Sequence, residues 1–145
     1  MCTLVYISAD VPLDRVSWNE ERPSFYVEGI DESEAVVARH LGAGVVLHAG
    51  SHEGCGCGFQ LGAYPDDADD EERALTRASL DAFAAYLEAQ LERVSVVRLF
   101  ACWDGEQSAP PEHQRALTPD SLRSEGFYLL KGELSTVRRE PGSPP

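Results

Sequence analysis

One histidine and two cysteines stand close together in the glycine-rich stretch GSHEGCGCGFQ, residues 50–60, and a second histidine lies just before it. Side chains on an extended chain repeat every two residues, so His48 and His52 share a face. By the same rule Cys55 and Cys57 share a face, and the glycines around them let the chain fold tightly around something small. Two imidazoles and two thiolates make a tetrahedral zinc site. The predicted zinc ligands are His48, His52, Cys55 and Cys57, with Cys102 and Asp104 as alternates.

The spacing of the two cysteines leaves other interpretations of this stretch open. Zinc sites commonly use C-x2–4-C pairs, whereas C-G-C is tighter, and no second cysteine pair follows downstream. Two thiols beside histidines can also have lowered pKa values and react as a redox pair, with Cys102 as a resolving thiol. In a purely structural interpretation the glycines form a bulged loop, the cysteines are small buried side chains and His48 is a core histidine.

Cys2 would carry a free α-amino group beside its thiol once Met1 is removed. A terminal amine that serves as base for the nucleophile is the arrangement of the N-terminal nucleophile hydrolases. The first three residues, MCT, resemble the start of some members of that superfamily, such as the choloylglycine hydrolases. The resemblance implies a four-layer αββα core, which is considerably larger than this chain and has more strands, so membership is not inferred. In a parallel sheet Cys2 would lie at the opposite end from Cys102, and only antiparallel pairing would bring them together.

The chain carries 12 basic and 25 acidic residues among its 145, a net charge of −13 with histidine neutral. Such a surface repels phosphate backbones and anionic lipid, so we expect no nucleic-acid partner and no membrane partner, whereas a basic protein partner could dock by charge steering. There is no basic leader and no apolar run near the ~20 residues of a membrane helix. We therefore expect a cytoplasmic protein whose cysteines are reduced thiols, redox groups or metal ligands rather than structural disulfides.

Apolar patterning predicts strands that alternate with helices. Residues 3–9 predict a buried strand, and residues 45–51 and 94–103 are apolar on both faces, as in central strands. Residues 24–30 predict a shorter strand, which Pro23 confines to an edge because proline cannot donate to a ladder. The remaining predicted elements are a helix over 31–44 capped by Asp31 or Ser33, a long helix over 69–93, a loop over 105–117, a helical turn over 118–124, and one or two strands over 126–140.

This order of elements predicts an α/β fold. We expect a single small domain over residues 1–140, with a mixed but largely parallel sheet of about four to five strands and helices packed on it, and a disordered tail over 141–145. The alternative is an α+β fold with a mixed or antiparallel sheet, because the C-terminal segment looks antiparallel. Ligands of open α/β sheets bind beyond the carboxyl ends of the strands. If the three buried strands are parallel, their ends bring the thiols and imidazoles together at one rim.

The cysteine-rich stretch supports three functional hypotheses. In the first, the ion is zinc, and an open coordination position could hold a water molecule that acts as a hydrolytic nucleophile. In the second, the chain is a non-enzymatic protein–protein interaction module. In the third, it is a thiol-dependent enzyme that uses Cys55 or Cys57. Nucleotide binding is not expected, because a phosphate-binding loop needs a helix that begins at once, whereas an acidic segment follows here.

Overall fold

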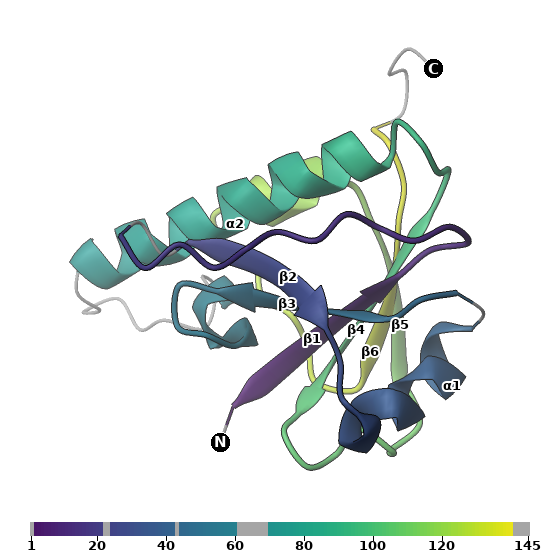
Figure 1. The fold of residues 1–145 in the computed structure, drawn as a ribbon. Helices are drawn as coiled ribbons and strands as arrows, with labels where there is room; N and C mark the ends of the chain where they lie inside the picture. Colours follow the sequence, from purple (N-terminus) through teal and green to yellow (C-terminus); the bar gives the residue numbers. More distant parts are fainter. Residues whose placement is uncertain (1, 22–23, 43, 61–69, 141–145) are drawn as a thin grey trace.

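The computed structural model describes residues 2–21, 24–42, 44–60 and 70–140, which build one six-stranded sheet flanked by helices (Figure 1). The strands are β1 (Thr3–Ser8), β2 (Phe25–Gly29), β3 (Leu47–Ser51), β4 (Val97–Trp103), β5 (His113–Leu117) and β6 (Glu133–Val137). The α-helices are α1 (Ala38–Leu41) and α2 (Asp70–Gln90), and the short 3-10 helices are η1 (Glu32–Val37), η2 (Gly56–Phe59) and η4 (Pro119–Arg123). None of the helices described is both long and apolar enough to cross a bilayer.

The strand order is β2-β3-β1-β4-β6-β5, and every neighbouring pair is antiparallel except β5 with β6. The prediction of a largely parallel α/β sheet is therefore wrong, and the fold is α+β. Burial on both faces suggested parallel central strands, but here it arises because helices cover both faces of an antiparallel sheet. Val5 and Tyr6, for example, point to opposite faces of β1 and are both fully buried.

β3 and β4 nevertheless run in the same direction, because each is antiparallel to β1, which lies between them. Their carboxyl ends therefore lie on either side of the amino end of β1. The register pairs Leu4 with Cys102, and just beyond it the backbone N–H of Asp104 donates to the carbonyl oxygen of Cys2 at 2.8 Å. Antiparallel pairing thus places Cys2 at the same edge of the sheet as the end of β4.

Most predicted elements are confirmed within one to a few residues, and β5 is the strand that the sequence did not predict. The segment over 105–117 was expected to be a loop, yet β5 pairs with β6 at the far edge of the sheet. Most β5 side chains are exposed, so the strand lacks an apolar pattern. Within 126–140 only β6 forms, and it begins directly after Gly132, whose φ is +82°. The predicted tail over 141–145 lies outside the described residues.

α2 covers one face of the sheet with the apolar side that its spacing predicts (Figure 1). Leu80, Phe83 and Leu87 are fully or almost fully buried against the strands. The Phe83 ring stacks on Phe25 of β2, with 5.0 Å between ring centroids, and lies 4.9 Å from Phe59 of η2. The end of η2 is therefore part of the main core.

η1 and α1 cover part of the opposite face, around a second core cluster that includes Tyr6 and Phe100. The Asp31 side chain accepts from the backbone N–H of Glu34 at 3.2 Å and forms a complete capping box with it, as predicted for Asp31. The turn ends at Gly42, whose φ of +82° favours glycine. This small helical layer leaves both faces of the central strands in apolar surroundings.

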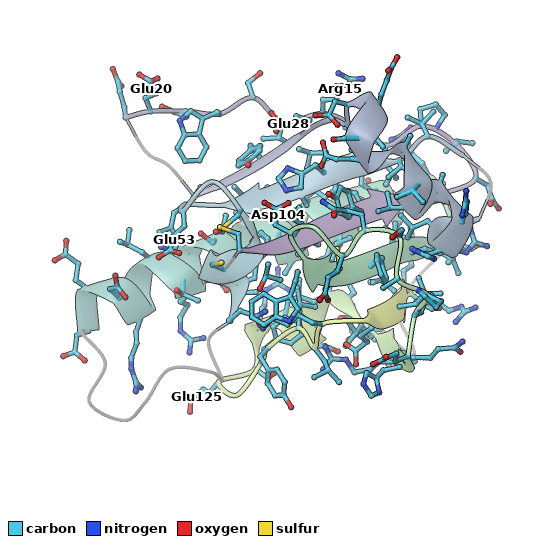
Figure 2. The ribbon with its side chains drawn as sticks, turned by 90° about the horizontal axis from the view of Figure 1, so that it is seen from below. Arg15, Glu20, Glu28, Glu53, Asp104 and Glu125 are labelled. Atoms are coloured by element: carbon cyan, nitrogen blue, oxygen red, sulfur yellow. The ribbon has the colours of Figure 1, made fainter. Side chains whose placement is uncertain are left out.

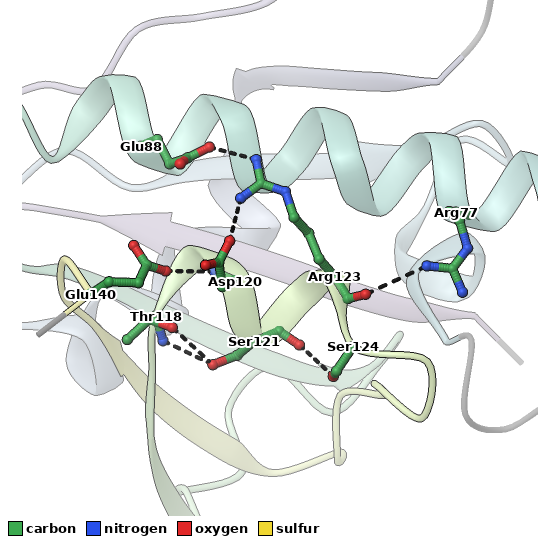
Figure 3. A network of polar contacts seen from close by, with 8 residues as sticks. All are labelled: Arg77, Glu88, Thr118, Asp120, Ser121, Arg123, Ser124 and Glu140. Atoms are coloured by element: carbon green, nitrogen blue, oxygen red, sulfur yellow. Dashed lines mark hydrogen bonds and ion pairs between the residues drawn. The ribbon is translucent and has the colours of Figure 1, made fainter. Parts of the chain in front are cut away.

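η4 is attached to α2 by a network of polar side chains (Figure 3). Arg123 donates to Glu88 of α2 at 2.5 Å and to Asp120 at 2.7 Å. Thr118 caps η4 through a reciprocal arrangement with Ser121, and Pro119 takes the first helical position, as predicted. Because these ion pairs are partly exposed, each contributes only about 0.2–1 kcal/mol to stability.

Candidate metal centre

Three cysteine sulfurs meet at the edge of the sheet where β3 ends and β1 begins. The Sγ atoms of Cys2, Cys55 and Cys57 all lie within 4.8 Å of one another. Cys55 is buried, Cys57 is half-buried and Cys2 is exposed, and all three are free thiols. Figure 2 shows sulfur atoms at this edge, beside the labelled Glu53. We refer to these three residues as the cysteine triad.

Ser51, the last residue of β3, fixes the loop that carries two of the three thiols. Its hydroxyl donates to the carbonyl oxygen of Cys55 at 2.6 Å, and its backbone N–H donates to the same oxygen at 2.8 Å. The hydroxyl oxygen also accepts from the N–H groups of Glu53, at 3.3 Å, and of Gly58, at 3.1 Å. A serine hydroxyl has one donor and two acceptor positions, so the fully buried Ser51 uses all of them within this loop.

The glycines of the loop permit turns and contacts that a side chain would prevent. Gly54 has a φ of +80°, in the left-handed region that favours glycine. A Cβ atom added to Gly56 would lie 2.7 Å from Cγ2 of Val5, and one added to Gly58 would lie 2.3 Å from Oγ of Ser51. The loop therefore packs with its backbone directly against β1 and β3, which brings its cysteines to the start of β1.

The triad sulfurs differ in their electrostatic surroundings. The backbone N–H of Thr3 donates to Sγ of Cys57 at 3.3 Å. Burial raises the pKa of Cys55 to about 12, against a lowering effect of a backbone hydrogen bond from Cys57, and the neighbouring thiols add to the rise. Without a metal ion Cys55 is therefore a neutral thiol at neutral pH. A bound cation would displace its proton, because a coordinating thiol is deprotonated by the ion.

His48 points away from the triad, into the opposite face of the sheet. Its ring lies between Tyr6 and Tyr26, with 5.7 Å between centroids in each pair, and its Nδ1 is 3.6 Å from Oε1 of Glu28. The Tyr26 hydroxyl in turn donates to the carbonyl oxygen of Gly54 at 2.5 Å. The structure thus places His48 behind the loop, among aromatic rings, where it supports Tyr26.

His52 connects the loop to α2. Its Nδ1 is hydrogen-bonded to Oγ of Ser79 at 2.9 Å, and its backbone N–H donates to the same oxygen at 3.1 Å. Its Nε2 lies 3.8 Å from Oε1 of Glu53. Among the described residues, the cluster of potential metal ligands contains three sulfurs and neither of the histidines from the predicted set.

Cys102 lies at the same edge but on the face opposite α2, in the second core cluster. It lines a cavity of about 170 Å³, together with Trp103 and Lys131, whose Nζ lies 4.5 Å from the centroid of the Trp103 ring. Cys102 is almost fully buried, and it does not belong to the triad. Burial raises its pKa to about 12, and the carboxylates of Glu106 and Asp104 add to the rise.

We expect the Cys102 thiol to lower stability at alkaline pH. Between the ordinary thiol pKa of 9.0 and the folded value of about 12, the unfolded chain ionises while the folded chain does not. The stabilising contribution is thus fully present below pH 9.0 and is lost as the pH rises, with a slope of up to about 1.4 kcal/mol per pH unit. Urea denaturation at a series of pH values, with a chelator present, measures this slope. Cys102→Ala should reduce the slope without abolishing it, because the buried Cys55 thiol has a pKa raised in the same way. Parallel profiles for the two proteins would contradict the assignment.

Sequence reasoning treated Cys2 separately from the metal site, although the structure places it in the triad. The signal that could have joined them is antiparallel pairing, which puts the start of β1 beside the end of β3. Asp104, the other alternate ligand, lies beside Cys2 through its backbone, while its Oδ1 accepts from Gln107 at 3.3 Å. No protein-family model, curated protein sequence or solved structure significantly matches this chain, so its function is inferred from the site itself.

Proposed function

We propose that this protein binds one thiophilic metal ion, specifically zinc, through the thiolates of the cysteine triad. The observation that carries the proposal is the separation of the three Sγ atoms, all within 4.8 Å of one another. Three sulfurs bound to zinc at ~2.3 Å with tetrahedral angles lie ~3.8 Å apart. A contraction of at most about 1 Å between any two of the sulfurs would therefore close the triad around an ion.

The donor set supports a zinc site with an open fourth position. Sites in which the protein supplies three ligands complete the tetrahedron with water or an external ligand. Soft thiolates prefer zinc and Cu(I) to harder ions, so a calcium or magnesium role is not favoured. The water-activating chemistry expected from the sequence would require this fourth position.

The proposed site needs reduced thiols, which suits the cytoplasm. All four cysteines are free thiols, and one residue separates Cys55 from Cys57. A thiol-dependent enzyme is the second candidate, and Cys57 would have to be its nucleophile, because burial keeps Cys55 protonated at neutral pH. Zinc content separates the two functions.

Elemental analysis and zinc titration test the proposal. Protein purified without chelator and under reducing conditions should contain one zinc per chain, and competition with a chromophoric chelator gives its affinity. Loss of an outer-shell partner costs roughly 10–100-fold in metal affinity, so removal of a ligand should cost at least about 100-fold in Cys55→Ser and Cys57→Ser. Cobalt substitution should show thiolate-to-metal charge-transfer absorption.

Cys102→Ser is the matched control for these variants. Cys102 is buried, as Cys55 is, but it lies outside the triad, so its replacement should leave zinc stoichiometry and affinity unchanged. If the wild-type protein holds no stoichiometric zinc, or if the control variant loses zinc as readily as Cys57→Ser, the proposed site is wrong.

A further inference from the structure

The loop of the triad is already built from contacts that do not involve a metal ion. Ser51 holds the loop together through five hydrogen bonds, and the Tyr26 hydroxyl donates to the carbonyl oxygen of Gly54. Phe59, at the end of the loop, is fully buried in the main core. Small domains that need a structural zinc are unfolded without it, because the metal replaces a missing core. This loop, in contrast, is anchored in a hydrophobic core that forms without a metal ion.

The three cysteines of the triad differ in their exposure to solvent. Cys55 lies inside the molecule and Cys57 is half-buried, whereas Cys2 is exposed. Zinc held by these thiolates would therefore have its most accessible bond at Cys2 and its least accessible bond at Cys55. An incoming ligand would meet the exposed Cys2 first, and an open fourth position could accept its sulfur before an existing bond breaks.

Two acidic residues lie close to the triad in the fold. Glu53 belongs to the loop itself, with 39% of its side chain exposed, and Asp104 is exposed beside the backbone of Cys2. Figure 2 shows these two labelled residues near the sulfur atoms, whereas Glu20 and Glu125 lie well away from them. The net charge of −13 adds to the local field. A positively charged ligand is therefore drawn toward the triad, and an acidic one is repelled.

We infer that zinc at the triad is exchangeable cargo, which passes by direct ligand exchange to the cysteine thiolates of a basic protein acceptor. This inference rests on the proposed function. In the first step an acceptor thiol loses its proton and its sulfur bonds to zinc, the bond between zinc and Sγ of Cys2 breaks, and Cys2 takes up a proton. Cys57 and then Cys55 are displaced in the same way, and zinc remains divalent throughout.

Two synthetic peptides test the direction of transfer. Each peptide contains three cysteines that can take over the zinc. In the first peptide the cysteines are flanked by lysines, and in the second by glutamates. A chromophoric chelator detects any zinc that dissociates without being transferred to a peptide. With the full chain loaded with zinc, the transfer rate should rise in proportion to the concentration of the basic peptide. The basic peptide should be at least about tenfold faster than the acidic one at low ionic strength. At about 1 M salt, where the Debye length is ~3 Å, this difference should vanish.

Two double variants that remove the same charge test whether the carboxylates near the triad cause the preference for the basic peptide. Glu53→Gln with Asp104→Asn should reduce the preference for the basic peptide several-fold, whereas Glu20→Gln with Glu125→Gln, which removes the same charge elsewhere, should leave it nearly unchanged. Circular dichroism and amide exchange of zinc-free protein should show the folded sheet.

The outcomes separate this inference from the proposed function. Absence of stoichiometric zinc removes both. If zinc binds but leaves at a rate independent of peptide concentration, or if the zinc-free protein is unfolded, the ion is structural and the inference is overturned while the zinc site stands. Transfer that depends on peptide concentration but is equal for both peptides overturns the assignment of a basic acceptor.

Discussion

Replacing Gly58 by alanine is expected to lower zinc affinity at least about tenfold and to destabilise the fold by about 1–3 kcal/mol. The added Cβ would lie 2.3 Å from Oγ of Ser51 and 2.7 Å from Cε1 of His52. Both neighbours are buried and hydrogen-bonded, so neither can move without breaking contacts that shape the loop. Displacement of the Gly58 backbone carries Cys57 with it. Urea denaturation and chelator competition measure the two effects.

Gly126→Ala is the matched control for this substitution. Nothing lies within 4 Å of a Cβ added to Gly126, so this variant should keep both wild-type stability and wild-type zinc affinity. If Gly58→Ala binds zinc as tightly as Gly126→Ala, the close packing of the loop backbone is not what positions Cys57.

The elements of the sheet were predictable because their signals are local. Apolar runs identified β1, β3 and β4, the i, i+3, i+4 spacing identified α2, and Asp31 identified the start of η1. β5 was not predicted because an edge strand that is largely exposed to solvent needs no apolar face. Its backbone bonds to β6 are set by the neighbouring strand, not by its own side chains.

Strand direction was not predictable from the same signals. The apolar residues of a strand do not show in which direction it runs relative to its neighbours. Burial on both faces occurs in any strand that has helices on both faces of its sheet. The insertion of β1 between β3 and β4 depends on long-range pairing, such as Val5 with Ala49 and with Ala101. The ends of β3 and β4 therefore lie at one edge because both strands are antiparallel to β1. The same pairing places the start of β1, and with it Cys2, at that edge.

The predicted ligand set shows where periodicity stops applying. Alternation placed His48 and His52 on one face, but the strand ends at Ser51 and the chain then turns. His48 keeps its strand position among aromatic rings, whereas His52 lies in the turn and bonds to Ser79. The period of two holds only for extended backbone. Cys55 and Cys57 nevertheless remain together, because they flank a single residue.

Phe59→Ala is expected to cost about 3–5 kcal/mol of unfolding free energy, a large part of the 5–15 kcal/mol typical of a domain. Phe59 is fully buried and lies 4.9 Å from Phe83 and 6.2 Å from Phe25 between ring centroids. Because Phe59 ends the loop two residues after Cys57, its loss should also release the loop. Zinc affinity should then fall at least about tenfold, as it does when residues that hold metal ligands in place are removed. Should the alanine variant unfold, Phe59→Leu provides a smaller perturbation of the same anchor.

Phe100→Ala separates the loss of stability from the release of the loop. Phe100 is fully buried in the second core, on the opposite face of the sheet, so its truncation should cost a similar 3–5 kcal/mol. Measured under conditions where both variants are folded, zinc affinity should fall in Phe59→Ala and stay within a few-fold of wild type in Phe100→Ala. Equal losses in the two variants would mean that zinc binding follows global stability and that the Phe59 anchor does not hold the triad in place.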